Sequence, residues 1–266
     1  MRLFLLLAFL IFSVPVFAQG ADTVDAGNTP IDISADTALE WDREGAKYIA
    51  RGNARAAQGE TVVLGDILTA HYDPSGDGAT DLTELHADKN VQIINGAATV
   101  SGDHAVYNLL DETAKVTGDN LKMTNEDMVV TANDHFIYDA GAGTVTAVGN
   151  AVVTQGDKKL KTQKLTAYLE QNTDGKSEIK RIEAPGAVTI TTPTEVIVGN
   201  RGSYNVAGDK AVLTGDVKIT QDKNELTGQK AEVNMTTGVS KMFAGENKDG
   251  SDGRVRGIFY PKDKDK

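Results

Sequence analysis

The four histidines are the side chains with the widest range of possible chemistry. They stand at His71, His86, His104 and His135, and no two are four residues apart, the spacing that puts two imidazoles on one helix face as metal ligands. The chain also lacks the GxSxG nucleophile elbow, the P-loop and the HExxH motif. We therefore expect no catalytic residue, no metal site and no cofactor, and hence a protein that is not an enzyme.

Acidic residues offer two further chemistries. The 38 Asp and Glu could include a glycosidase pair, but a solvated acidic face explains them as well. Residues 73–78 (DPSGDG) resemble part of a calcium loop, yet they lack the full set of ligands and the terminal bidentate Glu. Because Asp77-Gly78 favours positive φ at both positions, the sequence predicts a hairpin turn there.

Overall charge narrows the class of partner. The net charge of −11 argues against nucleic acid, which requires a basic surface. It leaves room for an anionic ligand held by a local basic rim. The chain has no cysteine, so its stability must come from core packing and backbone hydrogen bonds.

The elements that would position these groups are organised by an internal repeat. Residues 52–78 (GNARAAQGETVVLGDILTAHYDPSGDG) return 97 positions later as residues 149–175. Without a gap, residues 52–119 and 149–216 share 20 identities in 68 positions, where about 5 would be expected by chance. A repeat of this regularity determines the architecture.

The repeat reads as β-strands separated by turns. Ile31 and Ile33 alternate with polar residues, which is typical of a strand with one buried face. Trp41 and Tyr48 flank a predicted hairpin. Further turns are predicted at Gln58-Gly59, Gly52-Asn53, Gly118-Asp119, Gly149-Asn150, Pro185-Gly186 and Gly215-Asp216. We expect an all-β chain of short strands, stacked in layers along one axis, with open sheet edges at both ends.

The N-terminus reads as a targeting segment. Met1-Arg2 precedes the apolar run Leu3–Val14, and Ala18 follows Pro15 at a position suited to signal-peptidase cleavage. The predicted organisation is a signal peptide at 1–18, a leader at 19–29, a first β-unit at 30–127, a second at 128–224, a partial third unit with closing strand at 225–260, and a charged tail at 261–266.

The apolar positions of the strands support two interpretations. A closed core would need them, and so would a lipid channel. They are Ile31, Ile33, Val91, Ile93, Val188, Ile190, Val217 and Ile219. The tyrosines, among them Tyr107 and Tyr204, either pack under sheet corners or line such a channel.

The order of several motifs resembles one known family. A signal peptide is followed by PIDISAD, a tryptophan hairpin, GNARAAQG, strands with D/N-x-x-x-Y, and finally GRVRGIFYPKDK. This order resembles the OstA-like family of periplasmic lipopolysaccharide-transport proteins. The resemblance implies an antiparallel β-jellyroll (β-taco) of two facing sheets, whose apolar groove holds lipid A acyl chains and shields them from water.

The resemblance also implies site residues and partners. The family's groove positions fall on Ile31, Ile33, Ile93 and Tyr107, next to Val91, and the internal repeat adds Val188, Ile190 and Tyr204. Edge strands at Ile31, Asp32, Ile33 and Ser34, and at Val255 and Ile258, would pair with partners. The implied partners are an LptC-like inner-membrane component, an LptD-like outer-membrane translocon, and further copies joined end to end. The implied location is the periplasm.

Two other classes of protein stay open at this stage. A structural or adhesive β-solenoid at the cell surface would have the same repeat around a dry core. A polysaccharide-active β-solenoid enzyme would require an acidic pair on one face, which the sequence does not place.

Overall fold

The computed structural model describes residues 31–75, 82–126, 128–172, 177–234, 237, 239–245 and 253–260. Within these ranges every helix or strand is a β-strand, and the pairings between strands are antiparallel. None of these residues forms a helix long and apolar enough to cross a membrane. The all-β antiparallel prediction is confirmed. The predicted signal peptide, leader, Asp77-Gly78 turn and charged tail lie outside the described residues.

The chain forms two compact units. The N-terminal unit contains the described residues up to Gly149 together with Tyr168–Glu178, and the C-terminal unit contains Asn150–Ala167 and the residues from Ile179 onward. These units are defined by spatial contacts. The predicted boundaries at 127/128 and 224/225 rest on sequence repetition and stay predictions.

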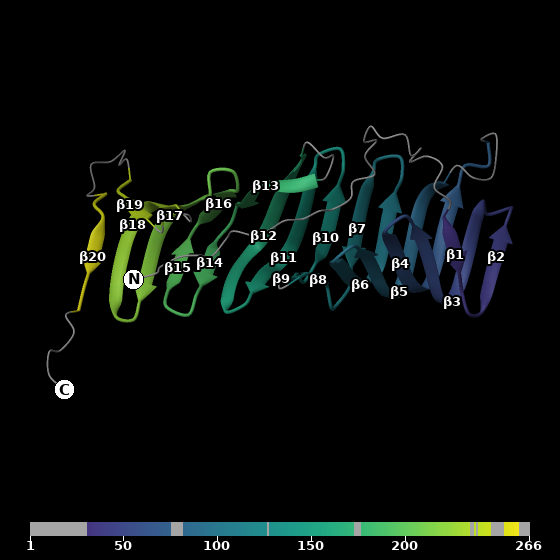
Figure 1. The fold of residues 1–266 in the computed structure, drawn as a ribbon, viewed down its shortest axis with the longest axis horizontal. Helices are drawn as coiled ribbons and strands as arrows, with labels where there is room; N and C mark the ends of the chain where they lie inside the picture. The colour runs from purple at the N-terminus through teal and green to yellow at the C-terminus, as the bar shows by residue number, and fades with distance from the viewer. Residues whose placement is uncertain are drawn as a thin grey trace. The chain divides into compact units, whose positions relative to one another are not determined.

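Ten strands lie wholly in the N-terminal unit. They are β1 (Asp32–Ser34), β2 (Ala38–Asp42), β3 (Lys47–Gln58), β4 (Thr61–Tyr72), β5 (Leu82–Asn95), β6 (Ala98–Asn108), β7 (Thr113–Thr117), β8 (Lys122–Asn125), β9 (Met128–Thr131) and β10 (His135–Asp139). The long strands β3, β4, β5 and β6 pair in chain order and lie side by side (Figure 1).

Three strands contribute residues to both units, and seven lie in the C-terminal unit. The shared strands are β11 (Thr144–Gln155), β12 (Lys158–Gln171) and β13 (Ser177–Ala184). The others are β14 (Val188–Thr191), β15 (Val196–Gly199), β16 (Arg201–Asn205), β17 (Lys210–Gln221), β18 (Asn224–Asn234), β19 (Val239–Phe243) and β20 (Arg256–Ile258).

Each long strand is interrupted near its middle by a β-bulge. The register shifts between Arg51 and Ala54 in β3, and between Thr214 and Val217 in β17. Gly52 and Asn53 have φ of 83° and 42°, and their repeat partners Gly149 and Asn150 have 89° and 48°. The turns predicted at these pairs, and at Gly215-Asp216, are therefore wrong. Gly and Asn supply positive φ to a bulge as readily as to a turn, because both need it.

The other turn predictions are confirmed where the chain is described. Residues 43–46 join β2 to β3, Gly59 lies between β3 and β4, and Pro185-Gly186 lies between β13 and β14. Residues 118–121 join β7 to β8. The prediction of short strands between closely spaced turns is wrong for β5 and β12, which have 14 residues each.

The bulges divide the sheet of each unit into two halves. In the N-terminal unit, β2 pairs with residues 47–51 of β3, whereas β1 pairs with residues 55–57. At the other side of the sheet, β7 pairs with residues 104–108 of β6 and β8 with residues 98–101. We call the half that contains β2 and β7 half-sheet A, and the half that contains β1 and β8 half-sheet B.

The C-terminal unit has the same division. Half-sheet A contains β13, β16, β19 and residues 210–214 of β17, and half-sheet B contains β14, β15, β20 and residues 217–221 of β17. Figure 1 shows β14 and β15 side by side in this unit. The two facing sheets predicted from the sequence are thus the two halves of one folded sheet in each unit.

Candidate functional site

Half-sheet B of the N-terminal unit carries an inward-facing apolar row that contains two of the predicted groove residues. Cross-strand pairs join Ile33 to Ala56, Ala56 to Val63, Val63 to Ile93, and Ile93 to Val100. Because alternate residues of a strand face the same side, Ile31 is on the same side of its chain as Ile33. Ile31, Ile33 and Ile93 are all partly exposed, so this row is a side of the interior that solvent still reaches.

Val91 lies one step closer to the bulges than Ile93. It is 1% exposed and pairs with Gly102. A Cβ added to Gly102 would come within 2.6 Å of the Val116 side chain on half-sheet A. The two halves therefore approach most closely beside the bulges, and Val91 is a core residue of the fold.

Half-sheet A presents a row of small and apolar side chains to the same interior. All its members are buried, and consecutive members are paired across neighbouring strands: Ala50, Leu68, Ala87, Ala105, Val116, Phe136 and Ala147. The alanines of this row were not predicted from the sequence to line the interior. Alanine gives little periodic signal because its hydrophobicity is small, yet it allows the two halves to pack closely.

A second row of half-sheet A, farther from the bulges, holds aromatic side chains. Tyr107 pairs with Leu85 on one side and Ala114 on the other, and Ala114 pairs with Tyr138. Burial raises the pKa of Tyr138 to about 12, and the neighbouring Tyr107 adds to the effect. Burial also raises the pKa of Tyr107, with a smaller contribution from Glu112. Both phenols stay neutral at physiological pH, which suits an apolar lining.

In the C-terminal unit the predicted residues Val188, Ile190 and Tyr204 are all buried. They line one small cavity of about 30 Å³. Its lining comes from both half-sheets and consists of Leu160, Leu165, Ile182, Ala184, Val188, Ile190, Gly202, Ser203, Tyr204, Ala211, Val212 and Leu213. At about 30 Å³ this cavity has no room for an acyl chain unless the two half-sheets move apart.

Tyr204 is fixed within this interior by a hydrogen bond. Its hydroxyl donates to Asp209 Oδ1 at 2.8 Å. Burial, followed by this bond to the carboxylate, raises the pKa of Tyr204 well above its usual value. The phenol ring thus forms part of the cavity wall while its polar atom is satisfied.

The predicted partner-contact residues lie on strands at the edges of the sheets. Asp32, Ile33 and Ser34 form β1, and Ile258 is the last residue of β20, which pairs with residues 225–227 of β18. Val255 precedes β20 and is exposed. In the part of the chain that the structure describes, β1 and β2 pair with β3 only. Unpaired edges of this kind can accept a strand from another chain.

The edge hairpin β2–β3 also exposes large apolar side chains, which the sequence analysis did not select. Leu39 is 63% exposed and Trp41 is 50% exposed. The Trp41 indole N–H donates to the Tyr72 hydroxyl at 3.1 Å, and its ring stacks on Tyr48. The exposed apolar residues at the other edge strands are Val239, Phe243, Phe259 and Tyr260.

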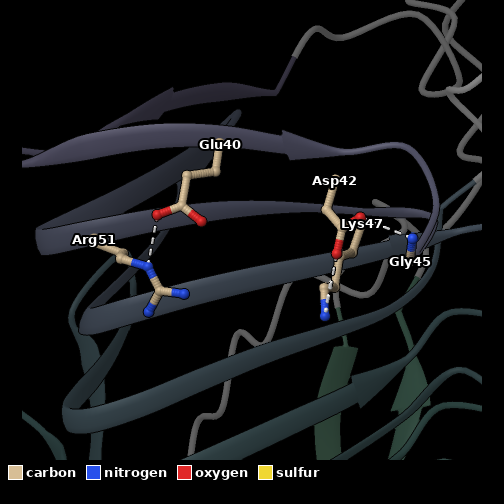
Figure 2. A network of polar contacts seen from close by, with 5 residues as sticks. All are labelled: Glu40, Asp42, Gly45, Lys47 and Arg51. Atoms are coloured by element: carbon tan, nitrogen blue, oxygen red, sulfur yellow. Dashed lines mark hydrogen bonds and ion pairs between the residues drawn. The ribbon is translucent and has the colours of Figure 1, made fainter.

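Polar contacts on the same hairpin fix its shape (Figure 2). Arg51 Nε lies 2.8 Å from Glu40 Oε1, and Lys47 Nζ lies 3.5 Å from Asp42 Oδ2. Asp42 Oδ1 also accepts the Gly45 N–H at 2.8 Å, and this bond is the main reason why the pKa of Asp42 is lowered. The edge is thus a preformed surface.

Two of the histidines on half-sheet A pair with neighbouring acids. His86 Nε2 lies 2.8 Å from Glu84, and His104 Nδ1 lies 2.8 Å from Asp88. Among the described residues, no three His, Asp or Glu side chains are grouped so as to hold a metal ion. Where the calcium-like loop is described, Asp73 Oδ1 accepts hydrogen bonds from the Ser75 backbone and hydroxyl, and these bonds lower the pKa of Asp73.

Comparison with known proteins identifies one family. The profile of the family described as LptA/(LptD N-terminal domain) LPS transport protein matches the chain twice, at residues 32–139 and 130–239. An uncharacterized protein of Rhizobium meliloti (strain 1021) is 25% identical over 129 residues, which are 47% of this chain and 69% of the relative. The crystal structure of LptH, the LptA homologous periplasmic component of the lipopolysaccharide transport device of Pseudomonas aeruginosa, aligns over 88% of this chain and 96% of its own. Its identity to this chain is 14% and its TM-score is 0.23.

Proposed function

Because the chain belongs to the LptA/LptD N-terminal domain family of lipopolysaccharide-transport proteins, we propose that it is a periplasmic carrier that holds lipid A acyl chains between its half-sheets. The family is one of transport proteins rather than enzymes. The observation that carries the proposal is the apolar interior of each unit, in which Ile93 and Ile190 occupy equivalent positions of the two repeats.

Binding requires the half-sheets to separate. The cavity of about 30 Å³ is too small for an acyl chain, so lipid would replace contacts between the halves. Each buried methylene contributes about 0.8 kcal/mol, so a chain of about twelve carbons would gain roughly 10 kcal/mol on leaving water. This gain would act against the cost of the packing lost between the two halves.

The partly exposed row that contains Ile33 and Ile93 supports entry in the N-terminal unit. Ile93 in this row is partly exposed, whereas its counterpart in the second repeat, Ile190, is buried. Less packing is lost when such a row is uncovered, because fewer contacts exist there. We propose that acyl chains bind first at this row.

A photo-crosslinking amino acid at Ile93 and at Ile190 tests the carrier function. We expect lipopolysaccharide adducts at both positions, detected by immunoblotting. Gln92 and Thr189 are matched controls, because each precedes the test residue and faces the opposite side of the sheet. Absence of adducts at both Ile93 and Ile190 in a folded protein would contradict the proposal.

The small cavity favours one competing function, a structural or adhesive β-solenoid with a closed core. Such a protein would keep its half-sheets together, and no lipid would copurify with it. The same crosslinking experiment separates the two functions, since a closed core gives equal background at Ile190 and Thr189.

We further propose that the edge strands bridge partners. Residues Ile31 to Ser34 would pair with an LptC-like inner-membrane component, and the edge with Val255 and Ile258 with an LptD-like outer-membrane translocon or another copy of the chain. The exposed Leu39 and Trp41 would add apolar contact beside the first edge.

Proline substitutions test the first of these edges. Successive N–H groups along a strand point to opposite edges, so one of Asp32→Pro and Ile33→Pro removes an N–H from the free edge of β1. We expect that variant to lose complex formation with the LptC-like partner in a pull-down. Unchanged binding by both variants would exclude β1 as the pairing strand.

A further inference from the structure

A polar rim borders the cavity of the C-terminal unit. Lys158 lies two residues before the cavity-lining Leu160, and Thr192 two residues after Ile190, so each faces the same side as its apolar neighbour. Glu195 stands in the same relation to the buried Ile197. Thr192 and Glu195 are joined by a backbone hydrogen bond that extends the β14–β15 ladder. These three inward polar residues therefore continue the rows that form the cavity.

Glu195 is the exceptional member of this rim. Its side chain is only 5% exposed, and its Oε2 has no hydrogen-bond partner. Its backbone N–H donates to Thr192 Oγ1 at 2.9 Å, which holds the residue in place without satisfying the carboxyl group. Burial raises the pKa of Glu195. A buried polar atom without a partner costs stability, and its presence in a native fold calls for an explanation.

Lys158 is the second unusual member. Its inward position lowers the pKa of its ammonium group through burial alone. Among the described residues it forms no ion pair, whereas Lys210, Lys218 and Lys230 of the same unit each pair with a glutamate. A partly buried ammonium group that forms no ion pair is available to bind an anion from outside the chain.

The first copy of the repeat fills the same three positions differently. Thr61, Asn95 and Ala98 stand 97 residues before Lys158, Thr192 and Glu195. There the Asn95 amide donates to Thr61 Oγ1 at 2.8 Å, and Ala98 carries no polar group. The fold itself therefore requires neither charge, since the equivalent rim is built from a satisfied neutral pair.

From these observations we infer that Lys158 and Glu195 form a headgroup subsite for a phosphorylated, acylated amino sugar. The Lys158 ammonium binds a phosphate, and the Glu195 carboxyl group accepts a hydrogen bond from a hydroxyl or amide N–H of the sugar. This inference rests on the proposed function, because the acyl chains attached to the sugar must occupy the interior beneath the rim.

The repeat supplies the variants that test this subsite. Lys158→Thr and Glu195→Ala copy the residues of the first repeat, which the fold accepts, and Glu195→Gln keeps the shape of the side chain if Glu195→Ala does not fold. Lys159→Thr is the matched control, because Lys159 is the next residue on the same strand and faces outward. The probes are purified lipopolysaccharide, its enzymatically dephosphorylated form, and N-phenylnaphthylamine, an uncharged apolar dye.

We expect Lys158→Thr to weaken binding of lipopolysaccharide by about tenfold and to leave the dephosphorylated form and the dye unchanged, as for the loss of one charge-assisted bond. Glu195→Ala should weaken binding of both lipopolysaccharide forms about fivefold, because each keeps the sugar, and leave the dye unchanged. It should also raise the melting temperature of the ligand-free protein by about 2–4 °C, since it removes an unsatisfied group. Lys159→Thr should behave as wild type.

Two results would overturn the subsite. The first is wild-type affinity for lipopolysaccharide in both Lys158→Thr and Glu195→Ala while the Ile190 crosslink persists, which leaves the carrier function intact. The second is equal weakening for all three probes, which indicates general damage to the interior. If wild-type protein gives no crosslink at Ile190 and binds no lipopolysaccharide, the carrier function and the subsite fail together.

Discussion

Replacing Gly149 with alanine tests how much the bulge at this position contributes to the free energy of unfolding. Gly149 has φ of 89°, and a Cβ at this position would lie 2.8 Å from the backbone nitrogen of Asp134. Its carbonyl also accepts the Asn133 N–H at 2.7 Å, so the two segments are held together and cannot easily move apart. The substitution therefore imposes both an unfavourable dihedral and a backbone collision.

The two costs can be separated with a second glycine. A positive φ costs a residue with a Cβ about 1–2 kcal/mol. Gly59 has φ of 57° and no atom within 4 Å of an added Cβ, so Gly59→Ala measures the dihedral cost alone. The collision at Gly149 adds about 1–2 kcal/mol, as overpacking does in a core. We expect a loss of about 2–4 kcal/mol in the free energy of unfolding for Gly149→Ala and of about 1 kcal/mol for Gly59→Ala.

Urea unfolding of the two variants, followed by circular dichroism, measures the difference. Gly215→Ala is a second test of the collision, since its Cβ would lie 2.8 Å from the Asn200 Cβ, which side-chain rotation cannot move, and its loss should resemble that of Gly149→Ala. Equal losses for Gly149→Ala and Gly59→Ala would refute the reasoning, because the collision would then cost nothing.

Three further predictions concern the core, the charge network and the edge. Ile190→Ala should lower the free energy of unfolding by about 2–4 kcal/mol because it enlarges the apolar cavity that Ile190 lines, and a loss below about 1 kcal/mol in urea titrations would indicate that the side chain is only loosely packed there. Hydrogen bonds from Lys210 and then Lys230 lower the pKa of Glu232 to about 2. Because this folded-state pKa is below its ordinary value near 4.5, the stabilisation is present above that value and is lost as the pH falls toward 2. The melting temperature of Glu232→Gln should therefore change less with pH over this interval than that of the wild type. Identical dependence of the melting temperature on pH in both proteins would contradict the assignment. Trp41 is the only tryptophan of the sequence, so its fluorescence emission should shift to shorter wavelength when a partner strand covers β2. Leu39→Ser should reduce the affinity for the partner that this emission signal reports. An unchanged emission spectrum on complex formation would place the contact elsewhere.

Much of the fold follows from local patterns in the sequence. The alternation at Ile31 and Ile33 predicts β1, and the 97-residue repeat predicts that Ile93 and Ile190 occupy equivalent positions, which the cross-strand pairs confirm. The role of Gly52-Asn53 could not be predicted, because a hairpin and a bulge require the same positive φ. Only the pairing of residues on both sides, which depends on distant strands, distinguishes the two.

The candidate site was less accessible to sequence reasoning. The buried alanine row of half-sheet A is weak in any hydrophobic pattern, although its close packing brings the two halves together. Glu195 reads as one acidic residue among many, and its burial depends on the neighbouring strands. A signal did exist in the repeat, because Glu195 replaces Ala98 and Lys158 replaces Thr61, and a change from neutral to charged at an inward position is unusual.

The bulged strands also determine how the molecule can deform. Each long strand belongs to both half-sheets, so the two walls of the interior are joined by continuous backbone and not by side-chain contacts alone. Widening the interior then requires the long strands to bend at their bulges. The deformation is concentrated in the dihedral angles of about two residues in each strand, and the ladder hydrogen bonds on either side are kept. Widening the interior therefore does not require neighbouring strands within either half-sheet to separate.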